Sequence, residues 1–263
     1  MFDYIFQYLV RWCLTLFLIS LVAPASVWAN TYLDAVAWNR TAHQDWQSGF
    51  SDAVSIQANH AGIEIVPDPK NGTRKVLRIT IARRGNYSYV ANGSPRAELL
   101  FKGAATFAQG FEYLIKWSTY IPGDFEFDSK QMVIISQIHQ SAREGGATVA
   151  LTLLGTNYYV STRGGLQVER TTAGAKICCA DGDRGKWVNW TLRYIPDDSG
   201  RKSLTQLWKN GESVFRSEHI ANAYSGDQCA YLKIGLYKSG WKKERSDAEL
   251  QTLFYGPVSI FKR

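Results

Sequence analysis

An amide and an imidazole, Gln137 and His139, lie near the end of an otherwise apolar segment, QMVIISQIHQ (131–140). In a β-strand alternate residues share a face, so Gln137 and His139 are expected on one face, roughly 6.5 Å apart along the chain. The same alternation puts Val133 and Ile135 on that face, nearer the start of the strand. An imidazole beside an amide supplies a base next to a hydrogen-bonding group.

Two further segments combine one apolar face with one chemically active face. SPRAELLF (94–101) places Arg96 and Glu98 together, with Ala97 and Leu99 opposite. YLKIGLYKSGW (231–241) does the same for four alternating residues, Tyr231, Lys233, Gly235 and Tyr237. If the three strands are neighbours in one sheet, five candidate site residues converge: Arg96, Gln137, His139, Lys233 and Tyr237.

Several common hydrolytic chemistries lack their signature in this sequence. Glycoside hydrolysis uses two carboxylates at a controlled separation, and EFDSK (126–130) does not offer such a pair. There is no Gly-x-Ser-x-Gly nucleophile elbow and no His-Glu-x-x-His zinc motif. Asp181 and Asp183 do not continue into a calcium loop, and we interpret CCADGDRG as a turn.

A base, a phenol and cations suit β-elimination at a uronic acid. Arg96 and Gln137 would bind and neutralise the carboxylate, which favours the enolate-like transition state. Neutral His139 would take the C5 proton, since an imidazole titrates near pH 6.5. Tyr237 would protonate the leaving O4 oxygen, and the charge of Lys233 would favour the resulting phenolate.

The elements that position these residues are strands. Period-two alternation predicts strands in 76–83, 110–122 and 187–196, and Asn210-Gly211 predicts a hairpin over 203–217. Phe111, Tyr113, Ile115 and Trp117 are expected on one face of the second segment. No long amphipathic helix, internal repeat or linker is evident. We predict an all-β fold: a two-sheet antiparallel sandwich of jelly-roll, concanavalin-like type.

The N-terminus predicts export. Residues 1–29 combine Arg11, an apolar stretch from Trp12 to Val22 and small residues at Val27 and Ala29, as in a secretory signal peptide; the alternative is a retained anchor helix. We therefore expect a single domain over 30–263 in a secreted or periplasmic protein. The remaining chain keeps the net charge of +7, which favours an acidic partner.

A net positive charge is compatible with three kinds of acidic partner: nucleic acid, an anionic membrane and an acidic polysaccharide. The basic residues are scattered, with only KKER (242–245) clustered, which argues against nucleic acid and membrane partners. Cys178 or Cys179 is expected to pair with Cys229, because adjacent cysteines rarely bond to each other. No cofactor and no metal ligands are predicted, with a structural calcium ion left open, and the sequence does not indicate the oligomeric state.

The three motifs, in their order, resemble the jelly-roll polysaccharide lyases, which include heparin lyase I, glucuronan lyase and alginate lyase types. They are RAEL (96–99), QIH (137–139) and YLKIGLY (231–237). Weaker similarities, in FEYLIKWSTYIPGDF (111–125), GKWVNWTLRY (185–194) and LWKNGE (207–212), extend the resemblance over most of the chain.

The resemblance implies roles that match the chemistry above. His139 corresponds to the family's base and Tyr237 to its acid, although for some substrate stereochemistries the tyrosine does both. Arg96 and Gln137 match the carboxylate-binding positions, and Lys233 matches the lysine four residues before the tyrosine. Alginate lyases commonly have Arg where Leu100 stands, and Gln or Asn in place of Lys238-Ser239. These departures favour a glucuronate-type polymer over alginate.

Two other functions fit parts of this pattern. A non-catalytic carbohydrate-binding sandwich would use the same face, with aromatic rings stacking on sugars. A structural or adhesion domain would not explain why these polar residues occur in the QIH and Lys-Tyr strands. The leading hypothesis is a lyase acting on a (1→4)-linked, uronate-containing polysaccharide, which leaves a C4=C5 unsaturated uronate.

Overall fold

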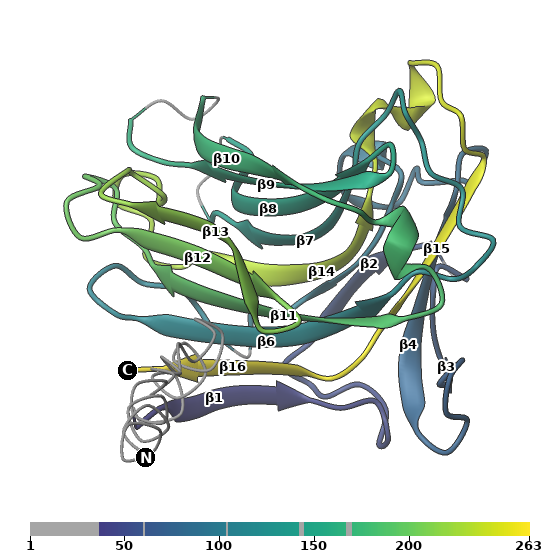
Figure 1. Cartoon of the computed structure of the whole chain (residues 1–263), viewed down its shortest axis with the longest axis horizontal. Coiled ribbons are helices and arrows are strands. Elements are labelled where there is room, and N and C mark those ends of the chain that lie inside the picture. The colour runs from purple at the N-terminus through teal and green to yellow at the C-terminus, as the bar shows by residue number, and fades with distance from the viewer. Residues whose placement is uncertain (1–36, 60, 104, 142–144, 167–169) are drawn as a thin grey trace, which may run out of the picture. The chain divides into compact units, whose positions relative to one another are not determined.

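Two antiparallel sheets face each other (Figure 1). Alternating apolar residues of their strands form the core between them. The structure, a computed structural model, describes residues 37–59, 61–103, 105–141, 145–166 and 170–263. The predicted signal peptide lies outside these residues. In the described part of the chain, helical structure is limited to three 3₁₀ turns: η1 (Ala91–Gly93), η2 (Asp181–Asp183) and η3 (Ser239–Lys242). None of its helices is long and apolar enough to cross a bilayer.

The larger sheet has nine strands. Seven run in the order β13-β12-β11-β6-β15-β4-β3, while β16 pairs with both β1 and β6. The strands are β1 (Asn39–Gln44), β3 (Ile63–Pro67), β4 (Lys75–Ala82), β6 (Tyr113–Tyr120), β11 (Trp187–Ile195), β12 (Leu204–Lys209), β13 (Glu212–Glu218), β15 (Leu250–Tyr255) and β16 (Val258–Lys262). This sheet forms one layer of the predicted sandwich.

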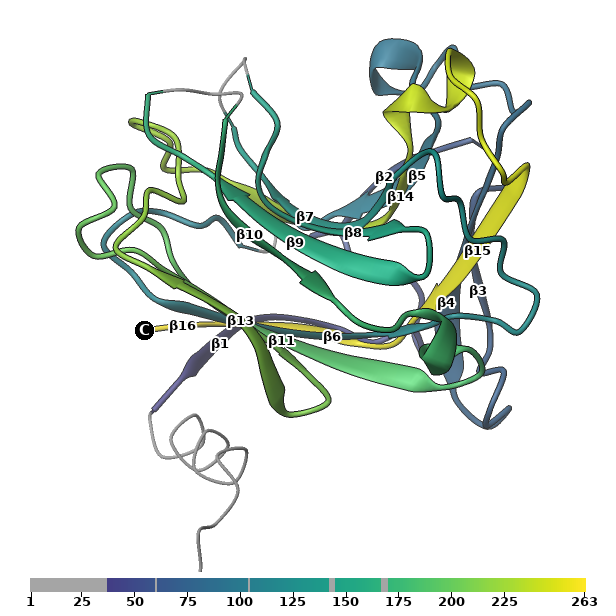
Figure 2. The same ribbon diagram turned by 45° about the horizontal axis from the view of Figure 1, so that its top comes forward.

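The smaller sheet has seven strands in the order β10-β9-β8-β7-β14-β5-β2. Its strands are β2 (Ser55–Ala58), β5 (Arg96–Leu100), β7 (Val133–His139), β8 (Ala147–Leu154), β9 (Asn157–Arg163), β10 (Thr171–Ile177) and β14 (Tyr231–Tyr237). The three motif-bearing strands β7, β14 and β5 are therefore neighbours, which meets the condition for their candidate residues to converge. Figure 2 shows this sheet curving above the layer formed by β6 and β11.

The core between the sheets follows the predicted alternation closely. Alternate residues of β11 (Val188, Trp190, Leu192 and Tyr194) are all buried, as are the alternate residues of β4. The Asn210-Gly211 hairpin joins β12 to β13, with positive φ angles of 51° and 85° that a two-residue turn requires. Phe111 departs from the prediction: it precedes β6 and is exposed, with the Lys262 ammonium over its ring.

The predicted facing of β7 is wrong in its first half. Val133 and Ile135 lie in the core between the sheets and not on the face of Gln137 and His139. The register against β8 shifts between Ile134 and Ser136, so β7 carries a β-bulge there. An extra residue in one strand reverses the facing of everything beyond it. The bulge lets one apolar strand bury Ile135 and still turn Gln137 outward.

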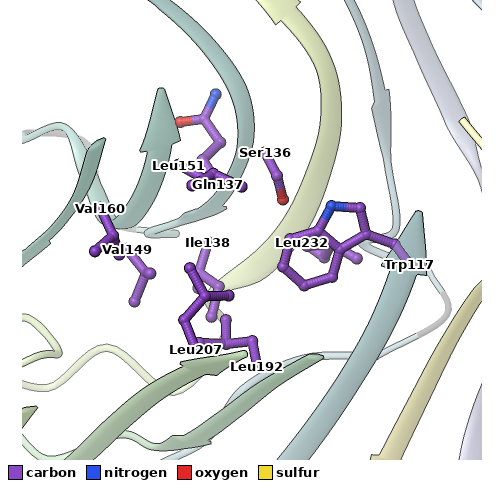
Figure 3. Close-up of a pocket in the computed structure, with 10 residues that line it drawn as sticks. All are labelled: Trp117, Ser136, Gln137, Ile138, Val149, Leu151, Val160, Leu192, Leu207 and Leu232. Atoms are coloured by element: carbon purple, nitrogen blue, oxygen red, sulfur yellow. The ribbon is translucent and has the colours of Figure 1, made fainter. Parts of the chain in front are cut away.

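Side-chain directions on β7 agree with this bulge. Figure 3 shows a small interior pocket lined by Ser136 and Ile138 of β7 together with Trp117, Leu192 and Leu207 from the other sheet. The amide of Gln137 points away from that interior. The strand therefore anchors in the core through one set of residues and presents another set on its outer face.

The predicted cysteine pairing is wrong. Cys178 is bonded to Cys179, and Cys229 is free and exposed. The two adjacent cysteines follow the last residue of β10, whereas Cys229 precedes β14. Three strands separate β10 from β14, a distance of roughly 19 Å at the usual strand spacing. Sheet order therefore prevents the expected bridge.

Candidate active site

A cavity of about 370 Å³ opens on the outer face of the seven-stranded sheet. Four of the five predicted site residues line it: Arg96, Gln137, His139 and Tyr237. They come from β5, β7 and β14, which are far apart in sequence and adjacent in the sheet. Sheet register brings them together, because Tyr237 pairs with Arg96 and Lys233 pairs with Gln137.

Gly235 allows β5 and β14 to approach at this point. It pairs with Glu98, has a φ of +130°, and a Cβ placed on it would lie 2.2 Å from the Ala97 carbonyl oxygen. Only glycine adopts such a backbone without strain and leaves room for the neighbouring strand. The glycine in YLKIGLY is thus a structural requirement for bringing Lys233 and Tyr237 against β5.

Lys233, the fifth predicted residue, lies beneath the cavity. Its side chain is buried, and its Nζ lies 3.5 Å from Glu98 Oε2 and donates to Gln57 Oε1 at 3.1 Å. Burial lowers the pKa of Lys233, as does the charge of Arg96, while Glu98 opposes both effects. The lysine therefore acts on the site through the network under the cavity floor.

Glu98 is the centre of that network; the sequence analysis placed it on one face with Arg96 but did not include it among the candidate site residues. It is 1% exposed and accepts hydrogen bonds from Arg96 Nη1, at 3.4 Å, and from the Gln137 side-chain amide. Together with Lys233, it joins three strands through one buried carboxylate. Its position in RAEL, two residues after Arg96 on the same face, was the available signal.

Contacts with Tyr237 and with Gln57 orient the guanidinium of Arg96. Its guanidinium lies 4.1 Å from the centre of the Tyr237 ring and also reaches Gln57 Oε1 at 3.5 Å. Its Nε is buried and has no hydrogen-bond partner in the described part of the chain. A guanidinium over an aromatic ring is a cation–π contact, which holds the two side chains in a fixed relation to each other. Arg96, rather than Lys233, therefore contacts Tyr237 directly.

His139 is held in the form that a base requires. Its Nδ1 lies 2.7 Å from the Gln140 carbonyl oxygen, which can only accept a hydrogen bond, so Nδ1 carries the proton and Nε2 keeps its lone pair. Burial lowers the pKa of His139, and the charges of Lys233 and Arg96 lower it further, against opposing effects of Glu98 and the Gln140 carbonyl. The imidazole is therefore neutral at neutral pH.

A second cavity, of about 430 Å³, adjoins the first across β8, β9 and β10. The two share four lining residues, Met132, Thr152, Ser161 and Arg163. Neither is lined by an Asp or Glu side chain in the described part of the chain, while Arg96, Arg163 and Lys176 contribute cations. The surface available to a ligand is thus a positively charged groove over six strands, β5, β14, β7, β8, β9 and β10. Within the described ranges, no three potential metal-ligating side chains gather into a cluster.

Comparison with known families decides the class of this protein. A family model described as polysaccharide lyase matches residues 33–255. The chain belongs to the polysaccharide lyase family. It is therefore a lyase that acts on polysaccharides, and the alternative of a non-catalytic module does not hold. No curated protein sequence matches the chain.

Solved structures of lyases share this fold at low sequence identity. The endo-β-1,4-glucuronan lyase of the fungus Trichoderma reesei has a TM-score of 0.68 and 15% identity, covering 84% of this chain and 95% of its own. The family 7 alginate lyase AlgAT5 has a TM-score of 0.53 and 14% identity, covering 78% and 84%. A product complex of the family 7 alginate lyase A1-II′ gives 0.53 and 14%, covering 81% and 85%. These similarities confirm the jelly-roll sandwich.

Proposed function

We propose that this lyase cleaves a (1→4)-linked uronate polymer by β-elimination in the cavity between β5, β14 and β7. His139 Nε2 takes the C5 proton, the C5–H electron pair forms the C4=C5 bond, and the C4–O4 bond breaks. Tyr237 donates its phenolic proton to the departing O4 oxygen. The products are a chain that begins with a C4=C5 unsaturated uronate at its new non-reducing end and a chain whose new reducing end keeps the former bridging oxygen as its C1 hydroxyl.

One observation carries this proposal: a neutral, oriented imidazole and a cation-contacted phenol line the same cavity. Arg96 and Gln137 line it too, and their N–H groups suit a carboxylate. Binding that carboxylate lowers the cost of the negative charge that develops as the C5 proton leaves. General acid–base catalysis then needs both groups within reach of one sugar.

We propose a glucuronate-type polymer, glucuronan or a heparin-like chain, ahead of alginate. Leu100 stands where alginate lyases commonly have a second arginine, and Lys238 follows the tyrosine. The similarity to a glucuronan lyase, which spans 95% of that chain, supports the same preference. We further propose that the enzyme is secreted or periplasmic, because residues 1–29 have the composition of a signal peptide.

An ultraviolet absorbance time course tests the reaction and names its substrate. Purified protein lacking residues 1–29 is given glucuronan, heparan-type, hyaluronan-type and alginate polymers in parallel. We expect rising absorbance from the conjugated C4=C5 bond on a glucuronate polymer. His139→Ala and Tyr237→Phe should each lower kcat by on the order of 10²- to 10⁴-fold.

Tyr231→Phe is the matched control. Tyr231 lies on the same strand as Tyr237, with its ring centre 5.6 Å from that of His139, but it does not line the cavity. It should keep most of the activity. Activity that survives in both His139→Ala and Tyr237→Phe would overturn the assigned roles. Loss in Tyr237→Phe alone would assign both proton transfers to the tyrosine.

A further inference from the structure

Arg163 is a cation of the groove that the reaction above does not use. It is the last residue of β9, is half-buried, and lines both cavities. Within the described residues it takes part in no hydrogen bond or ion pair, whereas two of the other three half-buried arginines there, Arg83 and Arg193, have carboxylate partners. Desolvating a guanidinium without a partner is unfavourable, so its position calls for an anionic ligand.

Gly146 makes the space in which this guanidinium lies. A Cβ built on Gly146 would be only 2.3 Å from Arg163 Nη1, so any larger residue would displace the arginine. The φ of Gly146 is not in the left-handed region, and its backbone therefore does not require glycine. The close approach to Arg163 is the structural reason for a glycine at this position.

Strand order places this cation on the far side of His139 from Arg96. Ala147 pairs with His139, and Gly146 directly precedes it, so the Arg163 guanidinium lies one strand beyond the imidazole. Arg96 lies on β5, two strands away from β7 in the opposite direction. An extended polymer in the groove would thus pass Arg96, then His139, then Arg163.

We infer that Arg163 forms a second anion site, which binds the carboxylate of the uronate next to the one that loses its proton. This inference rests on the proposed function. A guanidinium offers two parallel N–H donors that match a carboxylate. With no acidic side chain lining the groove in the described part of the chain, the site favours polymers that are acidic on successive units. It disfavours chains in which neutral sugars alternate with uronates.

The test compares KM and kcat for Arg163→Gln on glucuronan and on glucuronan whose carboxyl groups have been partly reduced to alcohols. A hydrogen-bonded charge contributes about 1.5–3 kcal/mol, so KM on glucuronan should rise about 10- to 100-fold with kcat nearly unchanged. Partial reduction should raise KM for the wild type more than for the variant. Gly146→Ala, which keeps the charge and displaces it, should also raise KM.

Arg245→Gln is the control of equal charge change. Arg245 is exposed and lines neither cavity, so KM should stay at the wild-type value. An unchanged KM in Arg163→Gln, with an active wild type, would overturn this inference alone. A fall in kcat as large as the change in KM would place Arg163 at the reacting sugar and also overturn it. A wild type inactive on every polymer would refute the proposed function, and the second site with it.

Discussion

Two buried lysines lie close together in sequence, Lys233 within β14 and Lys238 directly after this strand. The net charge of the groups around them differs. Lys233 lies with Arg96 around a single carboxylate, Glu98, at 3.4–3.5 Å. Lys238, directly after Tyr237, lies 2.9 Å from Asp128 and also donates to the Gln131 carbonyl at 2.8 Å. The first group holds two cations against one anion, and the second is a balanced pair.

The groups around Asp128 and Glu98 also differ in how completely their hydrogen bonds are formed. Asp128 accepts from Ser246 and from the backbone N–H groups of Lys130, Gln131 and Asp247, besides Lys238. The Glu98 group retains an unpartnered Arg96 Nε among the described residues and borders a cavity. A saturated, neutral cluster holds loops together, whereas an unsaturated, positive one is prepared for an anionic ligand.

Breaking the balanced pair should give the largest effect. Asp128→Asn leaves the fully buried Lys238 without its counter-charge, which typically costs 3–5 kcal/mol of unfolding free energy. Urea unfolding measures this loss, and kcat of the remaining folded enzyme should stay near the wild-type value. Asp124→Asn, in the same loop but exposed, should change stability little. A stable Asp128→Asn protein with low kcat would contradict the structural role.

The same pair also makes stability depend on pH. Burial opposes ionisation of Asp128, but hydrogen bonds from Ser246, Lys238 and two backbone N–H groups outweigh it and lower the pKa of Asp128 below 3.8. A carboxyl group with a lowered folded-state pKa stabilises above its unfolded-state value, and that contribution is lost as pH falls. Wild-type stability should therefore decline below about pH 4 more steeply than that of Asp128→Asn.

Neutralising the other carboxylate should mainly reduce activity. Glu98→Gln removes the charge that orients Arg96 and Gln137, and a misplacement of about 1 Å at such a site costs on the order of 100-fold in kcat/KM, or about 2.7 kcal/mol. Stability should fall less than in Asp128→Asn, because Arg96 borders an open cavity and Lys233 can release its proton. Glu64→Gln, on the surface of β3, is the control. Equal losses of stability in Glu98→Gln and Asp128→Asn would remove the distinction between the clusters.

The sequence predicted the two-sheet fold, and four of the five candidate site residues line one cavity. Period-two alternation identifies strands and their buried faces, as in β4 and β11. The motifs around Arg96, His139 and Tyr237 matched a known family, which implied that three distant strands are neighbours. Alternation alone does not give the order of strands in a sheet.

What the sequence did not predict depends on register and on contacts between distant residues. The bulge in β7 leaves no mark in VIISQIH, since apolar residues stand on both faces before Ser136. Glu98 was visible as a partner of Arg96, but its contacts with Lys233 and Gln137 arise from sheet pairing. Arg163 belongs to none of the three motifs, and its place in the groove becomes evident only from the structure, where it lies against Gly146. Strand order separates Cys229 from Cys178 and Cys179, and composition does not encode that order.

The smallest expected effect is a shift in the pH dependence of kcat/KM, which we expect on replacing Lys233 but not on replacing Lys238. Lys233 and Arg96 lower the pKa of His139, in addition to its burial, so the acid limb of kcat/KM should lie below pH 6.5 in the wild type. A base must be unprotonated, so activity rises with pH through that value. Lys233→Met removes one of the charges that disfavour the imidazolium, and the acid limb should move to higher pH by up to about one unit, or 1.4 kcal/mol.

Lys238→Met should leave the acid limb where it is, because Lys238 pairs with Asp128 outside the network around Glu98. A pH–rate profile of kcat/KM for both variants and the wild type measures the difference. A limb that moves equally in both variants would mean that the balanced pair also acts on His139 through its charge. A limb that moves in neither would assign the proton transfer from C5 to another group, and Tyr237 would then be the base. The sign of the shift in Lys233→Met thus tests both the comparison and the identity of the base.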